Sequence, residues 1–483
     1  MPALKLPMTT ILTALMYISL SSGAVMAFQS VDEFEKEPIL YSKSTPTNRV
    51  AELKAAIDAG EKTLEKTAEF GYLPDLLKAL EVPIESQTLV FSKTSLQMRR
   101  ISPRTPRAIY FNDNVYVGFC QSGDVLEISA VDPKLGTVFY SLDQHSPGGP
   151  FLQRQTDSCL VCHSSSRMEG IPGHVIRSLY VDSSGQPLLS AGSKTVDHTT
   201  PIKDRWGGWY VTGTHGSQSH LGNLVIRGRD VVEPVDNSEG QNLVELKYRI
   251  NPDRYLSAHS DIVALMVLEH QTLVHNRLTK ASFDTRQALA YDEMMRTMLD
   301  RPEGELLEST TRRIQSVCDR LVDSLLFVDE APLTAPMTGT SGFAEVLAAA
   351  GPRDQQGRSL RDLDMKTRMF KYPCSYLIYT DSFKQLPAEA RNCVFRKLRD
   401  VLSGADSSDK YGHLSSDDDR SSGRMEDLNS ILSQSASVEH GYRYAPSIEF
   451  MQSHLMQTPR WMREPVDTVL FLEPLPRLFS LAG

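Results

Sequence analysis

The residues best suited to chemistry form one short run, Cys159-Leu160-Val161-Cys162-His163. In the C-x-x-C-H pattern, the two thiols add to the vinyl groups of a haem as thioethers. On a turn of helix this spacing places both thiols at one edge of the porphyrin, and the next residue supplies an imidazole to the iron. The run therefore predicts one covalently bound haem c, attached at Cys159 and Cys162, with His163 as a metal ligand.

Chance, a zinc site and a redox-active thiol pair each fit the pattern less well than haem attachment. At this chain's Cys and His frequencies, a chance C-x-x-C-H is expected about 0.002 times. A zinc site needs a second C-x-x-C or an H-x-x-x-H partner, and the sequence has neither. A thioredoxin-like thiol pair needs a βαβ context, and residues 151–158 (FLQRQTDS) predict no such strand. Thr156, Asp157 and Ser158 can each cap the helical turn that haem attachment requires.

A second group of residues follows the motif and has the composition of a haem pocket. Residues 163–220 hold five of the twelve His and two of the three Trp. In the run 205–216 (RWGGWYVTGTHG), Trp206 and Trp209 can pack against a porphyrin, and the paired Gly allows close backbone approach. Arg205 and Arg227 can pair with its propionates. We therefore expect these side chains to bind the cofactor.

The sixth iron ligand is expected to be a histidine, or else absent. Met168 lies too close to the motif to reach across the ring, and no other Met follows before Met266. His215 is the favoured second metal ligand, ahead of His198 and His174, although each also suits a structural role. If the site is open, His215 can act as acid or base.

Two further features of the haem region stay open on sequence alone. In an open site, Arg205 would be the catalytic partner of His215, stabilising charge in redox chemistry on peroxide or another small molecule. Met266 and His270 share one face of a helix expected over 258–280, and could approach the iron. That face is more typical of plain core.

Composition bounds the class of protein. The chain has 483 residues, 40% of them hydrophobic, and a net charge of -9. An acidic chain without a Lys/Arg-rich block is a poor nucleic-acid binder, so we expect no nucleic acid as partner. Residues 1–27 have the charged, apolar and small-residue segments of a cleaved signal peptide. The protein is therefore expected in the periplasm or otherwise exported, without a transmembrane anchor after cleavage.

Periodicity predicts an α+β fold, in which an antiparallel β-rich N-terminal half carries the haem and a mainly α-helical half follows. Residues 28–85 are expected to be a linker and N-terminal helices (49–82), and 86–250 the β-rich haem-binding region with a meander over 86–144. A helical region follows over 251–330, with helices expected at 258–280, 283–300 and 304–328. The last region, 331–483, is expected to be mostly helical, including 387–402, with a mobile loop at 403–424 that is rich in Ser and Asp.

The chain resembles c-type cytochromes at the motif, and more of it is similar to a large group of exported bacterial proteins with a single C-x-x-C-H motif. The similar stretches are PRAIYFND (106–113), VLEISAVDPKLGTVFYSLDQ (125–144), TDSCLVCHSSSR (156–167), RWGGWYVTGTHG (205–216) and FKYPCSYLIY (370–379). A meander followed by the motif is also loosely similar to the cytochrome P-460 group, where the motif closes the chain. The resemblance implies haem binding but no established reaction.

Length favours an enzyme among the functions of a haem protein. A pure electron carrier needs only about 100 residues around one haem, and this chain has 483. We therefore expect a haem-dependent oxidoreductase that acts on a small molecule or peroxide. The alternatives are an electron-transfer subunit with a six-coordinate haem, partnered by a redox protein, and a haem-based sensor or scaffold.

Four Cys remain outside the motif, either as disulfides with three possible connectivities or as buried thiols: Cys120, Cys318, Cys374 and Cys393.

Overall fold

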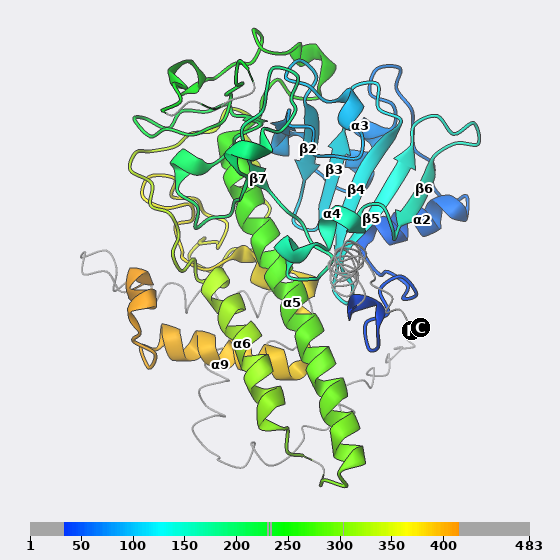
Figure 1. Cartoon of the computed structure of the whole chain (residues 1–483), viewed down its shortest axis with the longest axis vertical. Helices are drawn as coiled ribbons and strands as arrows, with labels where there is room; N and C mark the ends of the chain where they lie inside the picture. The colour runs from blue at the N-terminus through cyan, green and yellow to red at the C-terminus, as the bar shows by residue number, and fades with distance from the viewer. Residues whose placement is uncertain (1–32, 229–230, 232–233, 303, 415–483) are drawn as a thin grey trace, which may run out of the picture.

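The computed structural model describes residues 33–228, 231, 234–302 and 304–414 (Figure 1). The expected signal peptide at 1–27 and the end of the expected loop, 415–424, lie outside the described residues. Within the described part, an antiparallel sheet occupies the N-terminal half and helices the C-terminal half. The predicted α+β fold class is confirmed, while haem binding by the sheet region stays a prediction.

Seven strands form the main sheet in the order β6-β5-β4-β3-β2-β1-β9, and all neighbours are antiparallel. The strands are β1 (Thr88–Val90), β2 (Arg107–Phe111), β3 (Val115–Phe119), β4 (Val125–Asp132), β5 (Gly136–Asp143), β6 (Phe151–Gln155) and β9 (Trp209–Tyr210). The short strands β7 (Arg177–Ser178) and β8 (Lys194–Thr195) pair separately. The meander expected over 86–144 corresponds to β1–β5. The β2–β3 hairpin is closed by the side chain of Asn112, whose Oδ1 accepts the N–H groups of Asn114 and Val115 at 3.0 and 2.9 Å.

The helices fall largely within the expected segments, although 49–82 and 331–414 hold less helix than expected, since residues 59–72 and 350–380 lie outside the α-helices. They are α2 (Arg49–Asp58), α3 (Leu73–Ala79), α4 (Leu160–His163), α5 (Ile262–Met298), α6 (Glu308–Leu325), α7 (Phe343–Ala349), α8 (Asp381–Lys384) and α9 (Ala388–Leu402). The helices expected over 258–280 and 283–300 are a single helix, α5, because residues 281–282 include no Gly or Pro to end it. Asp261 caps its start by accepting the N–H groups of Val263 and Ala264.

Two other segments differ from the sequence-based expectation. Phe151–Gln155 was not expected to be a strand, but it forms β6 at the edge of the sheet by pairing with β5. Since this pairing is antiparallel, β6 does not provide a βαβ unit before the motif. The segment expected as a linker packs into the core from residue 34 onward, where Phe34, Ile39 and Tyr41 are at most 1% exposed.

The sheet separates two layers. Side chains that alternate along β2–β6 point to one face, where they form a core with leucines of α2 and α3. The other face is covered in part by α5, from which Gln271 Nε2 donates to Tyr116 Oη on β3 at 2.7 Å. Figure 1 shows α5 running past the sheet and continuing beside α6, with α9 across them. The motif helix α4 follows β6 and lies on the α5 side of the sheet, where Phe139 on β5 packs against His163.

Candidate functional site: the Cys159–His163 turn

The C-x-x-C-H run forms a single helical turn, as expected from its spacing. Cys159 stands at the start of α4, and its carbonyl accepts the N–H groups of Cys162 and His163 at 3.3 and 3.0 Å. Both thiols are free, with Cys159 half-buried and Cys162 exposed. Val161, between them, is 75% exposed. The turn thus presents the Cys162 thiol and the Val161 side chain outward, while Cys159 packs in part against the sheet core.

His163 is held in one orientation by its Nδ1 atom. Nδ1 lies 2.9 Å from the carbonyl oxygen of Gly173, and since a carbonyl only accepts, Nδ1 must carry the proton. The lone pair is therefore on Nε2, which no described residue hydrogen-bonds. Burial lowers the pKa of His163, which keeps the ring neutral. A neutral imidazole with a free Nε2 and an anchored Nδ1–H is the usual form of a metal-bound histidine.

The loop that anchors His163 is itself fixed by α5. Asn276 accepts the backbone N–H of His174 at 3.0 Å and donates to its carbonyl at 2.7 Å. A side chain on Gly173 would come within 2.5 Å of the Asn276 amide, so this close approach requires Gly. Phe139 on β5 packs against the His163 ring, with centroids 4.8 Å apart. Helix, loop and sheet together therefore position the imidazole.

A charged pair lies on the sheet face beside the motif. Arg107 Nη1 on β2 and Glu127 Oε2 on β4 are 3.0 Å apart, each side chain 21% exposed. They come together across β3 because the residue between them is Gly118. Their charges act on the pKa of His163, and Glu127 also helps to raise the pKa of Cys159, after burial as the main cause. Sequence alone does not reveal this pair, since only the strand register joins it to the motif.

The geometry of the two thiols fits neither alternative use of a C-x-x-C pair. Within the described residues, no three His, Cys, Asp or Glu side chains converge as a metal site requires. A zinc site needs such convergence, whereas thioether attachment does not. A redox-active pair needs a thiol with a lowered pKa, but burial raises that of Cys159.

Three of the four tryptophans and arginines expected at the cofactor have partners within the protein. Trp206 is fully buried and packs on His220, with ring centroids 5.2 Å apart, and Trp209 Nε1 donates to the Arg177 carbonyl at 2.9 Å. Arg205 is 1% exposed and pairs with Glu269 on α5 at 2.9 Å. Arg227 is exposed on the surface.

The structure does not bring Arg205 to the motif. Its partner Glu269 lies seven residues before Asn276 on α5, which corresponds to about 10 Å along the helix. Asn276 holds the loop that anchors His163, so the Arg205 pair and the motif contact different parts of α5.

His215 is likewise placed away from the motif. Thr212, close by in sequence, bridges to Asp261 at the start of α5, and Asn276 lies 15 residues, about 22 Å, further along. His215 is fully buried, and its Nε2 accepts the N–H of Asn242 at 3.0 Å. That bond uses the lone pair with which His215 would bind a metal.

The other histidines considered as distal ligands have hydrogen-bond partners of their own. Both ring nitrogens of His174 contact hydroxyls, Nε2 with Ser129 at 2.8 Å and Nδ1 with Thr137 at 3.2 Å. His198 Nδ1 lies 3.0 Å from His270 Nδ1, deep in the helical half. Burial lowers the pKa of His198 to about 4. These rings are therefore neutral parts of the core.

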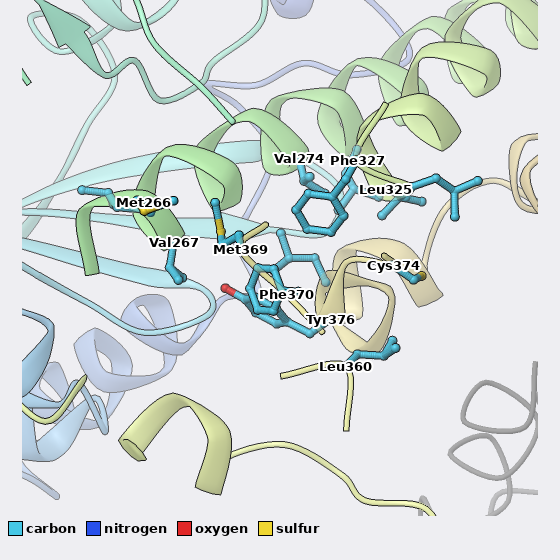
Figure 2. Close-up of a cluster of buried hydrophobic side chains, with 14 of the residues drawn as sticks. Met266, Val267, Val274, Leu325, Phe327, Leu360, Met369, Phe370, Cys374 and Tyr376 are labelled. Carbon is cyan, nitrogen blue, oxygen red and sulfur yellow. The ribbon is translucent and has the colours of Figure 1, made fainter. Parts of the chain in front are cut away.

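Met266 also belongs to the core, as its helical stripe predicts. It is 1% exposed, and Figure 2 shows it beside Val267, in the cluster that includes Phe370 and Tyr376. This packing accounts for the apolar face of α5 without an iron.

A small cavity adjoins the loop after the motif. It has a volume of about 130 Å³ and is lined by Met168, Ile171, His174, Asn276 and Arg277, among others. Small-molecule sites usually occupy roughly 300–1,000 Å³, so this cavity does not accommodate a porphyrin. The outward face of α4 is the open side of the motif.

Comparison with known proteins returns no family model, no curated protein and no solved structure that matches the chain. The resemblance to c-type cytochromes therefore stays a prediction that rests on the sequence stretches given above. Among the described helices, none has the length and apolar character needed to cross a membrane.

Proposed function

We propose that this chain is an exported c-type cytochrome that binds one haem through Cys159 and Cys162, with His163 as an iron ligand. The observation that carries the proposal is the state of His163. Its Nδ1–H is anchored on Gly173 at 2.9 Å, and its Nε2 is free of described partners. The exposed Cys162 and the half-buried Cys159 on the same turn supply the two thiols that attachment needs.

We propose redox chemistry on a small molecule as the role of this site. Bound haem would supply a one-electron iron couple. Arg107 and Glu127 are the charged residues that act on His163, and they take the roles for which the sequence suggested Arg205 and His215. The Arg107 guanidinium can stabilise negative charge on a bound substrate, while Glu127 can exchange a proton with it. His163 keeps its proton on Nδ1 throughout, because Gly173 holds it there.

Electron transfer to a partner protein is the second candidate. It is favoured by the exposure of the motif, since Cys162 is exposed and Val161 is 75% exposed. A cofactor edge at the surface suits exchange of electrons with a docked protein, whereas substrate chemistry usually requires a site that excludes water.

Two measurements test these proposals in turn. Haem staining of a denaturing gel should be positive for the wild type and absent in a Cys159→Ala, Cys162→Ala variant, with Cys374→Ala as a matched control that keeps the stain. Absorption spectra with and without CO then separate the two roles. Ready CO binding, altered in Arg107→Met, supports the oxidoreductase. A low-spin iron that is indifferent to CO supports electron transfer.

A further inference from the structure

Two cysteines far apart in sequence meet between the helices α6 and α9. Cys318 lies on α6 and is fully buried, and Cys393 lies on α9 and is 8% exposed. Cys318 Sγ is 3.5 Å from the carbonyl oxygen of Ala390, three residues before Cys393 and hence on the same face of α9. The two thiols also interact directly, and each changes the titration of the other. Figure 1 shows the two helices crossing here.

We propose that Cys318 and Cys393 form an intrachain disulfide by exchange with a small disulfide such as oxidised glutathione. The Cys393 thiolate attacks one sulfur of the oxidant, whose S–S bond breaks and releases one thiolate. The Cys318 thiol loses its proton and attacks the Cys393 sulfur, which releases the second thiolate. Two protein thiols are thereby oxidised, and one disulfide is reduced to two thiols. The proposal does not depend on haem.

The surroundings assign the attacking role to Cys393. A hydrogen bond from the Cys318 thiol, assisted by Arg396, lowers the pKa of Cys393. The same contact, together with burial, raises the pKa of Cys318. The thiolate is the nucleophile in thiol–disulfide exchange, and Cys393 is also the more exposed of the two.

The remaining cysteines outside the motif lack this arrangement. Burial is the main cause that raises the pKa of Cys120 and of Cys374, each to about 12. In the described part of the chain, no thiol acts on either of them. Cys374 lies in the same buried hydrophobic cluster as Leu325 and Leu360 (Figure 2). Of the pairings open on sequence, the structure thus favours Cys318–Cys393 over Cys374–Cys393, although the latter would close a shorter loop.

The bond would join two helices that are 75 residues apart, counted from Cys318 to Cys393. Closing a loop of this length restricts the unfolded chain, and the expected rise in the thermal midpoint is about 5 °C for a protein of this size. The oxidising compartment predicted from the N-terminal segment would supply the disulfide.

The test treats the purified full chain with oxidised glutathione under native conditions, then blocks free thiols and maps peptides without reduction. We expect the peptides of Cys318 and Cys393 to be joined, with a mass about 2 Da below their sum. Cys374→Ser should keep the link, and Cys393→Ser should lose it together with the rise in thermal midpoint. The proposal is overturned if both thiols remain free to alkylation, if Cys393 stops at a glutathione adduct, or if either residue pairs with Cys374.

Discussion

Replacing Arg205 with Met is expected to lower the free energy of unfolding by about 4 kcal/mol at pH 8, without changing the spectrum of bound haem. The Arg205 guanidinium and the Glu269 carboxylate are 1% and 0% exposed and lie 2.9 Å apart. Arg205 also donates to the carbonyls of Thr200 at 2.7 Å and His198 at 3.0 Å. Its removal leaves a buried carboxylate without its cation and two carbonyls without a charged donor.

The size of the loss in unfolding free energy depends on whether Glu269 takes up a proton when Arg205 is removed. Removing one partner of a buried ion pair typically costs about 3–5 kcal/mol, because the other charge stays buried. Burial raises the pKa of Glu269 to about 7, even though Arg205 opposes this. Without Arg205 the pKa rises further, so the carboxyl takes up a proton and the loss is limited. The penalty is therefore largest above pH 7, where wild-type Glu269 is ionised, and smaller below pH 6.

The sign of the pH dependence follows from linkage. The folded pKa of Glu269, about 7, is above the ordinary value of 4.5. The folded state thus binds an extra proton between these values, and this group's contribution to stability is present below pH 4.5 and lost as the pH rises through 7. In Arg205→Met the pKa of Glu269 is higher, so the free energy of unfolding continues to fall at higher pH. The stabilities of the wild type and the variant therefore differ most in alkaline solution.

A double-mutant cycle measured by chemical denaturation checks the account. Arg205→Met and Glu269→Leu should each be strongly destabilising, whereas the double variant should lose far less than the sum, with a coupling of at least about 2 kcal/mol. The reasoning is refuted if Arg205→Met unfolds at the wild-type denaturant concentration. A changed haem spectrum at unchanged stability would instead return Arg205 to the catalytic role that the sequence suggested.

Two further predictions concern histidines. Burial lowers the pKa of His198, His220 and His275 to about 4, 3 and 4. Since these values are below the ordinary 6.5, the contribution of the neutral rings to the stability of the folded state is present above pH 6.5 and lost as the pH falls toward 4. Thermal midpoints should therefore drop steeply below pH 6, and a flat profile from pH 7 to 4.5 would contradict the neutral core. Asn276→Leu should release the loop that anchors His163 and shift the redox midpoint of bound haem, whereas Gln287→Leu on the same helix should not; equal potentials in both variants would remove Asn276 as a positioning residue.

Local patterns predicted the elements well, because strand alternation and turn residues act over a few positions. The strands β1–β5 follow from the alternation of apolar residues and from Asn or Asp at the turns. Residues 207–211 (GGWYV) have a strand-like pattern and β9 forms there, but its pairing with β1, more than 100 residues earlier, does not follow from a local pattern. The length of α5 was hidden by a change in its apolar stripe where it leaves the sheet.

The candidate site was predicted only as far as the motif reaches. Spacing alone gives the turn with Cys159 and His163, because its geometry is local. The density of His and Trp after the motif suggested a cofactor pocket. In the structure, however, His215 is fully buried and its ring accepts a hydrogen bond from the Asn242 backbone, as part of a buried polar core. Arg107 and Glu127 carry no signal in sequence, since strand register brings them together.

The most direct test of the central claim is the mass of the peptide spanning residues 156–167, from protein purified out of a host that attaches haem c. The account predicts that this peptide carries one haem through thioethers to Cys159 and Cys162, and that the haem survives denaturation and acid extraction. A peptide with two unmodified thiols, or with a Cys159–Cys162 disulfide, obtained from a host shown to mature another c-type cytochrome, would contradict it.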